Sequence, residues 1–354
     1  PDIPNRGGDI TVSEKKTTVR EVAREANVSI ATVSRFLNQD YSGMSEDTKQ
    51  RLAVTVETLG YVNPRTKQNR TAALVLPGIT DPFFASLVET VSAALERAGF
   101  SVQLCLTHDS PEQEEHAIRR LLTPAVSGVV YISTVTSKEN CYDLLKNAGK
   151  PFVVLDNYLS EYNAFALVFS NGVYAMYEAT NYLLERGHRR IAYLSGMRLG
   201  MFEHYRYQGY VNSLLDAGLQ VDPRLVRFVG FNQQDGYHGF RDLLKAGEEF
   251  SAVICESDLL AAGVYQACHQ AGLRIPEDVS VIGFNNSLVC TLLEPALTSV
   301  DQQLDILAEQ AVQVLEQQIR GEVLSERTKK VPTKLVCRDS VRSLAESGEK
   351  GIST

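Results

Sequence analysis

Short apolar runs alternate with amphipathic segments of helical period from residue 72 almost to the end of the chain. Such repetition predicts βαβ units, and therefore parallel sheets with helices on both faces. Eight runs are too many for one compact sheet, so we expect an α/β body of two similar lobes, each a doubly wound parallel sheet. The runs are Ala72–Leu76, Ser101–Cys105, Gly128–Ile132, Phe152–Leu155, Ala164–Phe169, Ile191–Leu194, Ala252–Cys255 and Val279–Gly283. The connections between the lobes are expected near Asn157–Asn163, Asn285–Leu292 and Arg320–Leu324.

Charge divides the chain into two parts. The net charge is −8, but residues 14–70 hold 10 Lys/Arg and 7 Asp/Glu, or +3, while residues 1–13 hold −1 and the remainder therefore −10. A mildly basic head on an acidic body is typical of a DNA-binding module joined to a domain that does not touch DNA.

The remaining composition indicates a soluble cytoplasmic protein. Hydrophobic residues make up 44% and charged residues 22% of the 354, and no apolar run approaches the roughly 20 residues of a membrane span. Residues 1–16 are polar, so we expect a disordered tail and no secretory signal. The six cysteines are scattered, without a CxxC pair or metal-ligand spacing, which predicts free thiols in a reducing compartment and no metal or cofactor.

Residues 17–61 have the pattern of three short helices. Thr18 and Glu21 match a capping box ahead of the first helix, and Asn27 suits a tight turn after it. Ser29 is placed to cap a second helix over Ile30–Leu37. Two short helices joined by a tight turn and braced by a third predict a helix-turn-helix. A small helical bundle without a DNA role is the alternative.

The run from Thr18 to Asn38 resembles the head of the LacI/GalR repressor family; it reads TVREVAREANVSIATVSRFLN. Leu59-Gly60-Tyr61 is similar to the end of that family's third helix. The resemblance implies that the second helix enters the major groove. Arg35 would then read guanine, or alternatively clamp a phosphate. The expected groove and phosphate contacts are Thr18, Ser29, Ile30, Ala31, Thr32, Ser34 and Arg35, and Asn38 is either a helix terminator or a backbone contact.

Residues 62–71 depart from the family's linker, which forms a hinge helix whose leucine pries open the minor groove. This segment is shorter and has no leucine, so we expect neither the wedge nor a stable hinge helix. Arg65, Lys67 and Arg70 would run along phosphates or enter a narrow minor groove. A solvated basic tether is the alternative.

Polar residues follow several of the expected strands, where ligands of such sheets bind. Thr80 and Asp81 follow the first run, ahead of Phe83 and Phe84. Asp156, Ser257, Asp258 and Asn285 follow later runs. Their recurrence at strand ends predicts an effector site, although each also fits a helix cap or loop, and Asp81 before Pro82 fits a cap especially well.

The body also resembles the family, which implies the two-lobed fold of periplasmic sugar-binding proteins. Gly187–Leu194 is similar to the family's G-H-R-x-I-A signature, and Arg206 matches the arginine that grips the effector. A surface ion pair is the alternative for Arg206. Ser170 and Asn285 stand where the family usually has aspartates. Their loss of charge predicts an anionic effector, a sugar acid or sugar phosphate, unless both hydrogen-bond a neutral sugar. Ser34–Leu37 with Tyr41–Lys49 resembles the 2-keto-3-deoxygluconate repressor branch.

The predicted protein is therefore a repressor of carbohydrate metabolism that binds near-palindromic operator DNA as a homodimer. We expect the helix-turn-helix over 17–61, the linker over 62–71, the body over 72–340 and a tail over 341–354. Lobe 1 would take about 72–158 and 289–322, and lobe 2 about 159–288 and 323–340. The chain shows no P-loop, nucleophile elbow or GxGxxG after a strand, so we expect no enzyme. The alternatives are a stand-alone sugar-binding protein and a regulator with a degenerate pocket that answers to a protein partner.

Overall fold

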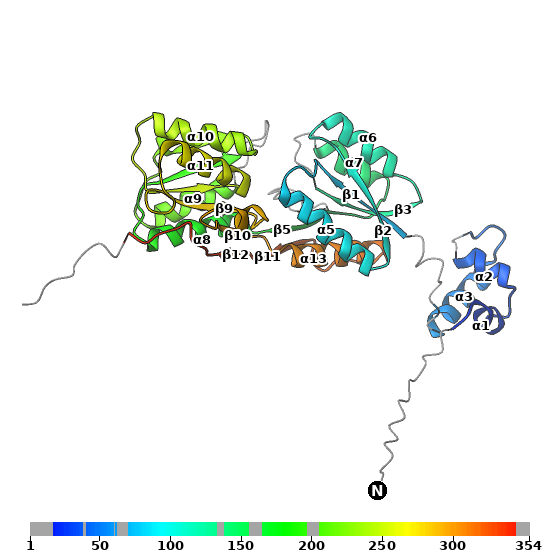
Figure 1. The fold of residues 1–354 in the computed structure, drawn as a ribbon. Coiled ribbons are helices and arrows are strands. Elements are labelled where there is room, and N and C mark those ends of the chain that lie inside the picture. Colours follow the sequence, from blue (N-terminus) through cyan, green and yellow to red (C-terminus); the bar gives the residue numbers. More distant parts are fainter. Residues whose placement is uncertain are drawn as a thin grey trace, which may run out of the picture. The chain divides into compact units, whose positions relative to one another are not determined.

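A computed structural model describes residues 17–37, 40–59, 61, 70–132, 138–155, 165–196 and 205–344 (Figure 1). Contacts divide the chain into two compact units, Pro1–Arg70 and Thr71–Thr354. We call the first unit the head and the second the body, and each is described by itself.

The head contains helices α1 (Val19–Glu25), α2 (Ile30–Leu37) and α3 (Glu46–Thr58). The capping box of Thr18 and Glu21 is present, and Asn27 has a positive φ of 49°, so the predicted tight turn is confirmed. The Ser29 hydroxyl accepts from the backbone N–H of Thr32, 3.1 Å away, which caps α2 as predicted. The apolar stripes of the three helices meet in one small core, of which the buried members are Val22, Ala23, Ala26, Val33, Leu52 and Tyr61.

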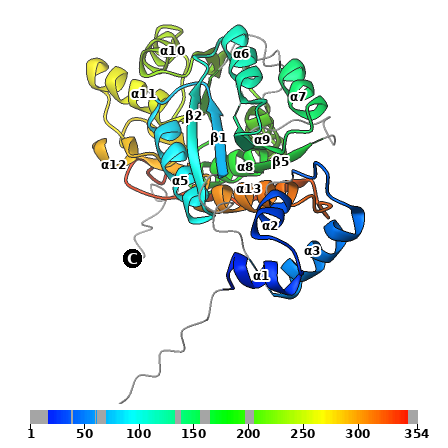
Figure 2. The same cartoon turned by 90° about the vertical axis from the view of Figure 1, so that its right-hand side faces the viewer.

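The first sheet of the body has the order β11-β5-β4-β3-β1-β2. Its strands are β1 (Arg70–Leu76), β2 (Phe100–Leu106), β3 (Val126–Tyr131), β4 (Phe152–Leu155), β5 (Ala166–Ser170) and β11 (Thr328–Val331). Alternate residues of β1 point to opposite faces. Leu74 and Leu76 pack with α5 (Pro82–Arg97) and α13 (Leu304–Ile319), whereas Ala73 and Val75 pack with α6 (Pro111–Leu121) and α7 (Lys138–Asn147). Figure 2 shows the same elements from a second direction.

The second sheet has the order β12-β10-β9-β8-β6-β7. Its strands are β6 (Ile191–Gly196), β7 (Val226–Val229), β8 (Ala252–Cys255), β9 (Ser280–Phe284), β10 (Thr298–Asp301) and β12 (Lys334–Val336), of which β12 runs antiparallel to β10. One core joins this sheet to α8 (Gly172–Glu185) and α9 (Tyr205–Asp216), and another joins it to α10 (Gln233–Lys245), α11 (Asp258–Ala271) and α12 (Val289–Leu292). The 3-10 turn Pro223–Leu225 precedes β7. The two doubly wound sheets confirm the predicted fold class.

The predicted lobe boundaries are wrong by one strand at each crossing. The described residues cross between the lobes at Asn171 after β5, at Gln302–Gln303 after β10, and between β11 and β12. Each strand that we assigned to the next lobe completes the sheet of the preceding one; β5, for example, pairs with β4, Val154 opposite Leu167. An apolar run does not reveal its pairing partner, so sequence periodicity finds the strand but not its sheet.

Candidate DNA-binding and effector sites

The outer surface of α2 carries most of the predicted DNA contacts. Ile30 is 48% exposed, and Ser29, Ala31 and Arg35 are also exposed, while Val33 on the opposite side is buried in the head core. Thr32 and Ser34 are half-buried. A short helix held by its inner face thus presents small apolar, hydroxyl and cationic groups together, which suits base edges and phosphates in a major groove.

Local hydrogen bonds orient this surface. The hydroxyls of Ser29 and Thr32 lie 2.8 Å apart, and Arg35 donates to the backbone carbonyl of Ser42 at 3.4 Å. Thr18 is exposed at the start of α1, where its N–H and hydroxyl both donate to Glu21. Thr18 and Ser29 stand at the N-termini of α1 and α2, and helix N-termini favour phosphate.

The predicted linker is only partly covered by the described residues. Asn38, Arg65 and Lys67 lie outside them. Arg70 is described, and it is the first residue of β1, so extended structure begins within the last two residues of the predicted linker 62–71. The pairing of Thr71 with Val126 in the neighbouring strand explains why the extended structure starts there.

The carboxyl ends of both sheets meet at the crossings between the lobes. β5 ends at Ser170 and leads into α8 of the second lobe, and β10 ends at Asp301 and leads into α13 of the first. Buried Gln302 lies between them. Ser170 donates to the Gln302 amide oxygen, and the Gln302 amide nitrogen donates to Asn285 Oδ1 at 2.8 Å. Two predicted effector residues from different lobes are therefore joined through a third that we did not predict.

Arg206 lies near the start of α9 and faces the ends of β8 and β9. Its Nη1 donates to the backbone carbonyl of Glu256 at 3.0 Å, and its guanidinium carbon lies 3.9 Å from the centre of the Phe284 ring. Stacking over an aromatic ring helps to orient a guanidinium. The contacts place Arg206 at the carboxyl edge of the second sheet, as the predicted effector role requires.

Glu256 also belongs to the candidate effector site, although the sequence analysis did not predict it. Its carboxylate accepts from the Tyr193 hydroxyl at 2.6 Å and from the Gly196 N–H at 3.1 Å, and the residue is 5% exposed. Burial, and then the neighbouring Glu256 carboxylate, raise the pKa of Tyr193 well above its usual value. A signal was available, because Glu256 directly follows an apolar run and precedes two residues that we did select.

Ser257 and Asp258, which were predicted as effector contacts, are both held by the protein itself at the carboxyl end of β8. Ser257 caps α11 and is 2% exposed. Asp258 is 1% exposed, and its two oxygens accept from Ser299 Oγ at 2.6 Å and Ser287 N at 2.7 Å. Burial raises the pKa of Asp258 to about 6, although these hydrogen bonds lower it. The packing is close, since a Cβ at Gly283 would overlap this carboxylate.

The effector residues predicted in the first lobe lie around the start of α5, and fewer of them are buried. Thr80 is exposed, and Asp81 caps α5 by accepting from Phe83 N at 2.9 Å, so the cap is confirmed. Phe83 is 5% exposed and belongs to the first-lobe core, with its ring 5.3 Å from that of half-buried Phe84. Asp156 lies outside the described residues.

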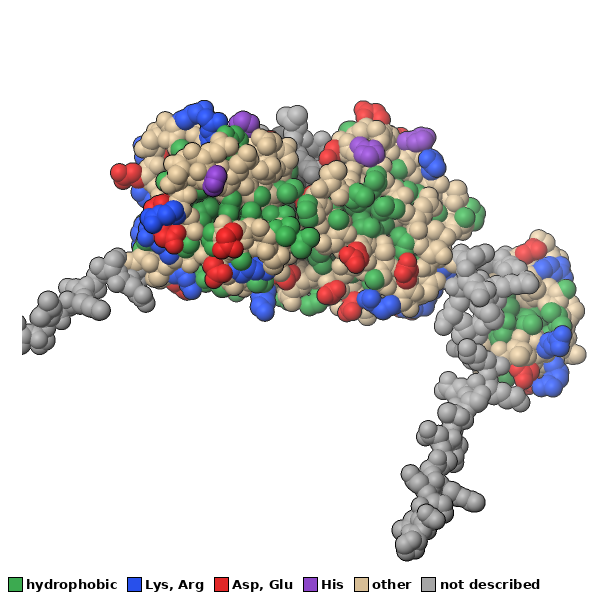
Figure 3. Space-filling view, viewed as in Figure 1, with side chains coloured by type: hydrophobic (Ala, Val, Ile, Leu, Met, Phe, Trp, Pro, Cys, Tyr) green, Lys and Arg blue, Asp and Glu red, His purple; other side chains and the backbone are tan. Residues whose placement is uncertain are grey.

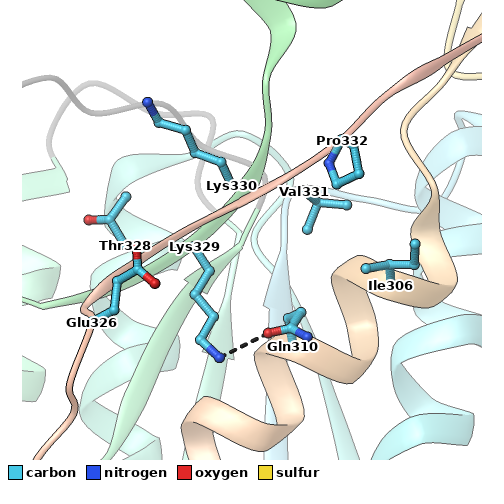
Figure 4. Close-up of a pocket in the computed structure, with 8 residues that line it drawn as sticks. All are labelled: Ile306, Gln310, Glu326, Thr328, Lys329, Lys330, Val331 and Pro332. Atoms are coloured by element: carbon cyan, nitrogen blue, oxygen red, sulfur yellow. Dashed lines mark hydrogen bonds between the residues drawn. The ribbon is translucent and has the colours of Figure 1, made fainter.

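A surface pocket of about 770 Å³ opens between β11 and α13, and none of the predicted effector residues lines it (Figure 4). Lys329 Nζ donates across it to Gln310 at 2.9 Å. Because β11 is the edge strand of the first sheet, its lysines also protect that edge from pairing with another strand.

The described part of the chain places no three His, Cys, Asp or Glu side chains to hold a metal ion, and none of its helices is long and apolar enough to cross a membrane.

Comparison with known proteins agrees with this arrangement. Residues 18–63 match the bacterial regulatory proteins of the lacI family, and residues 180–341 match the periplasmic binding protein-like domain. The transcriptional regulator MalR of Streptomyces coelicolor is 30% identical over 346 residues, which cover 95% of this chain and 99% of MalR. The chain belongs to the LacI family.

Other LacI-family proteins support the same conclusion. The Escherichia coli transcriptional repressor CytR is 29% identical over 338 residues, covering 94% of this chain and 98% of CytR. The structure of the regulator CelR with cellobiose has a TM-score of 0.71 and 30% identity, covering 92% of this chain and all of CelR. This LacI-family chain is therefore a transcriptional regulator with a helix-turn-helix and a periplasmic-binding-like body.

Proposed function

We propose that the protein represses genes of carbohydrate metabolism by binding operator DNA and that a sugar-derived effector controls this binding. The exposed outer surface of α2, opposite the buried Val33, carries the proposal. Operator binding would place the protein in the cytoplasm with the DNA. The regulatory relatives favour this role over an enzyme, and the head favours it over a stand-alone sugar-binding protein.

The proposed DNA interface divides into base and phosphate contacts. Arg35 is the one side chain of the α2 surface with the donors to read guanine, and Ile30 and Ala31 suit a thymine methyl group. Hydroxyl and basic groups would bind phosphate. They are Thr18, Ser29, Thr32 and Ser34, with Asn38, Arg65 and Lys67 beyond the described residues.

The proposed effector site centres on Arg206. Thr80, Asp81, Phe84 and Asn285 would complete it, with Asp156 outside the described residues. A sugar is supported by the relatives, because CelR binds cellobiose. Ser170 and Asn285, where the sequence lacks the family's aspartates, both hydrogen-bond to the neutral Gln302 amide, and an anionic effector stays a prediction. The 2-keto-3-deoxygluconate branch stays a prediction.

The homodimer would form through exposed apolar side chains of the body. Leu104 on β2 is 42% exposed, and Leu288 and Leu292 beside α12 are 67% and 73% exposed. Figure 3 shows hydrophobic side chains gathered on one face of the body, and large exposed apolar patches mark interaction surfaces.

The double variant Leu288→Ser with Leu292→Ser should shift the mass measured by sedimentation toward that of the monomer. The control Val323→Ser, at a residue that is 96% exposed, should leave the mass unchanged.

The direct test of DNA recognition is a gel-shift titration on DNA upstream of the protein's own gene. Arg35→Ala should weaken specific binding by roughly 10- to 100-fold, as expected for loss of a bidentate base contact. Arg24→Ala, at an exposed residue of α1 outside the proposed interface, is the matched control. Equal losses for both variants, or weak binding without sequence preference, would reject the proposal. Specific binding that no small molecule alters would instead favour a protein partner.

A further inference from the structure

Glu256 lies buried at the end of β8, directly beside the proposed effector arginine. Its carboxylate is held on both sides, by Tyr193 and by the Gly196 N–H, and its own backbone carbonyl accepts from Arg206. One residue thus links the ends of β6 and β8 to the guanidinium of α9. The side chain is fixed because β6 donates a hydrogen bond to each of its two carboxylate oxygens.

The charges of Glu256 and Arg206 act on the same small volume. Both groups influence the Tyr193 hydroxyl, whose ionisation the carboxylate opposes and the guanidinium favours. Arg206 contacts the backbone carbonyl of the residue that carries this carboxylate, and at low effective dielectric a nearby carboxylate repels an incoming anion. An anion that approaches Arg206 therefore also approaches a fixed negative charge, whereas a neutral ligand meets no such repulsion.

A neighbouring hydroxyl points to the same kind of ligand. Ser195 lies two residues after Tyr193 on β6, so both side chains are on the same face of the strand. It is fully buried, and within the described part of the chain its hydroxyl has no hydrogen-bond partner. Buried hydroxyls are normally paired, and a ligand hydroxyl would pair this one.

We infer that Glu256 sets the charge selectivity of the effector site, so that the site takes neutral, hydroxyl-rich ligands and rejects anionic ones. The inference rests on the proposed effector function. Glu256 is a positioning and selectivity residue here, because it acts on the ligand through its charge and through Arg206. The predicted sugar-acid effector is replaced by a neutral sugar.

The test compares Glu256→Gln with Glu277→Gln, which makes the same change on an exposed carboxylate of the same lobe. Calorimetry of the full-length proteins would use inorganic phosphate, the pair D-glucose and D-glucuronate, and the pair D-ribose and D-ribose 5-phosphate. We expect Glu256→Gln to bind phosphate at least tenfold more tightly than the wild type and to shift preference toward the charged member of each pair. Glu277→Gln should behave as the wild type.

A further variant separates charge from structure. Tyr193→Phe removes one hydrogen bond to Glu256 but keeps the carboxylate charge, so it should retain the preference for neutral sugars. Tighter wild-type binding of the charged sugars, or no gain of phosphate binding in folded Glu256→Gln, overturns the inference. If Glu256→Gln does not fold, the wild-type sugar pairs decide. If no sugar binds any variant, the sugar-effector proposal fails, and the phosphate comparison still decides the role of Glu256.

Discussion

The carboxyl edges of the two sheets differ in how firmly their polar residues are held. In the second lobe, Glu256 and Asp258 are buried, and each carboxylate accepts two hydrogen bonds from the protein. In the first lobe, Thr80 is exposed, and Asp81 accepts a cap bond from its own helix. The difference is that Glu256 and Asp258 are held by distant parts of the second lobe, whereas Thr80 and Asp81 lie at the start of a local helix, so the second-lobe pair is the more preorganised.

The largest effect should come from removing the best-held carboxylate. Asp258→Ala leaves the Ser299 hydroxyl and the Ser287 N–H buried without an acceptor, so we expect the free energy of unfolding to fall by about 3 kcal/mol. Chemical denaturation of the body would measure it. A loss below about 1 kcal/mol would mean that the second-lobe edge is not held as described.

The same carboxylate should make stability depend on pH. Its pKa is raised to about 6 in the folded protein from an ordinary value near 4. The folded state therefore binds more protons than the unfolded state between these values, and Asp258 destabilises the fold progressively as pH rises from 4 to 6, by roughly 2–3 kcal/mol. Asp258→Asn should flatten this part of the stability curve. An unchanged curve would contradict the raised pKa.

Loss of the effector arginine should be the next largest effect. Arg206→Ala removes a charged donor from the binding edge, and affinity for the sugar that binds the wild type should fall by roughly 10- to 100-fold in calorimetry. Arg274→Ala removes an exposed arginine that pairs with Asp278, so it should leave the affinity unchanged. Equal losses for the two variants would remove Arg206 from the site.

The smallest effect on stability should come from a residue at the carboxyl edge of the first sheet. Asp81→Ala removes the cap of α5, which should cost about 1 kcal/mol of unfolding free energy. Because the first-lobe edge is less firmly held, this loss should be clearly smaller than that of Asp258→Ala under the same denaturant. A reversed order would contradict the comparison between the lobes.

Local signals in the sequence predicted local structure well. Thr18, Glu21 and Ser29 form the predicted caps, and Asn27 has the predicted left-handed conformation, because each depends on residues within one turn. The apolar runs located eight of the strands for the same reason. The partners of β5, β10 and β11 could not be predicted, since register between distant strands is set by tertiary packing.

The sequence predicted where polar residues lie, at the ends of the strands, but not what their side chains contact. Polar residues do follow the strands, but Asp258 faces its own lobe, and Gln302 binds Ser170 and Asn285 across the crossings. The partners that hold the Glu256 and Asp258 carboxylates lie 29 to 63 residues away in the sequence, and no spacing rule contains that information.

We propose that a neutral sugar bound at Arg206 controls the binding of operator DNA. The most direct measurement is gel-shift affinity for the upstream DNA, with and without a panel of neutral sugars, for the wild type and Arg206→Ala. We predict that one neutral sugar changes the wild-type affinity at least tenfold and leaves the variant unchanged. An equal change in both proteins, or a change produced by sugar acids alone, would contradict the account.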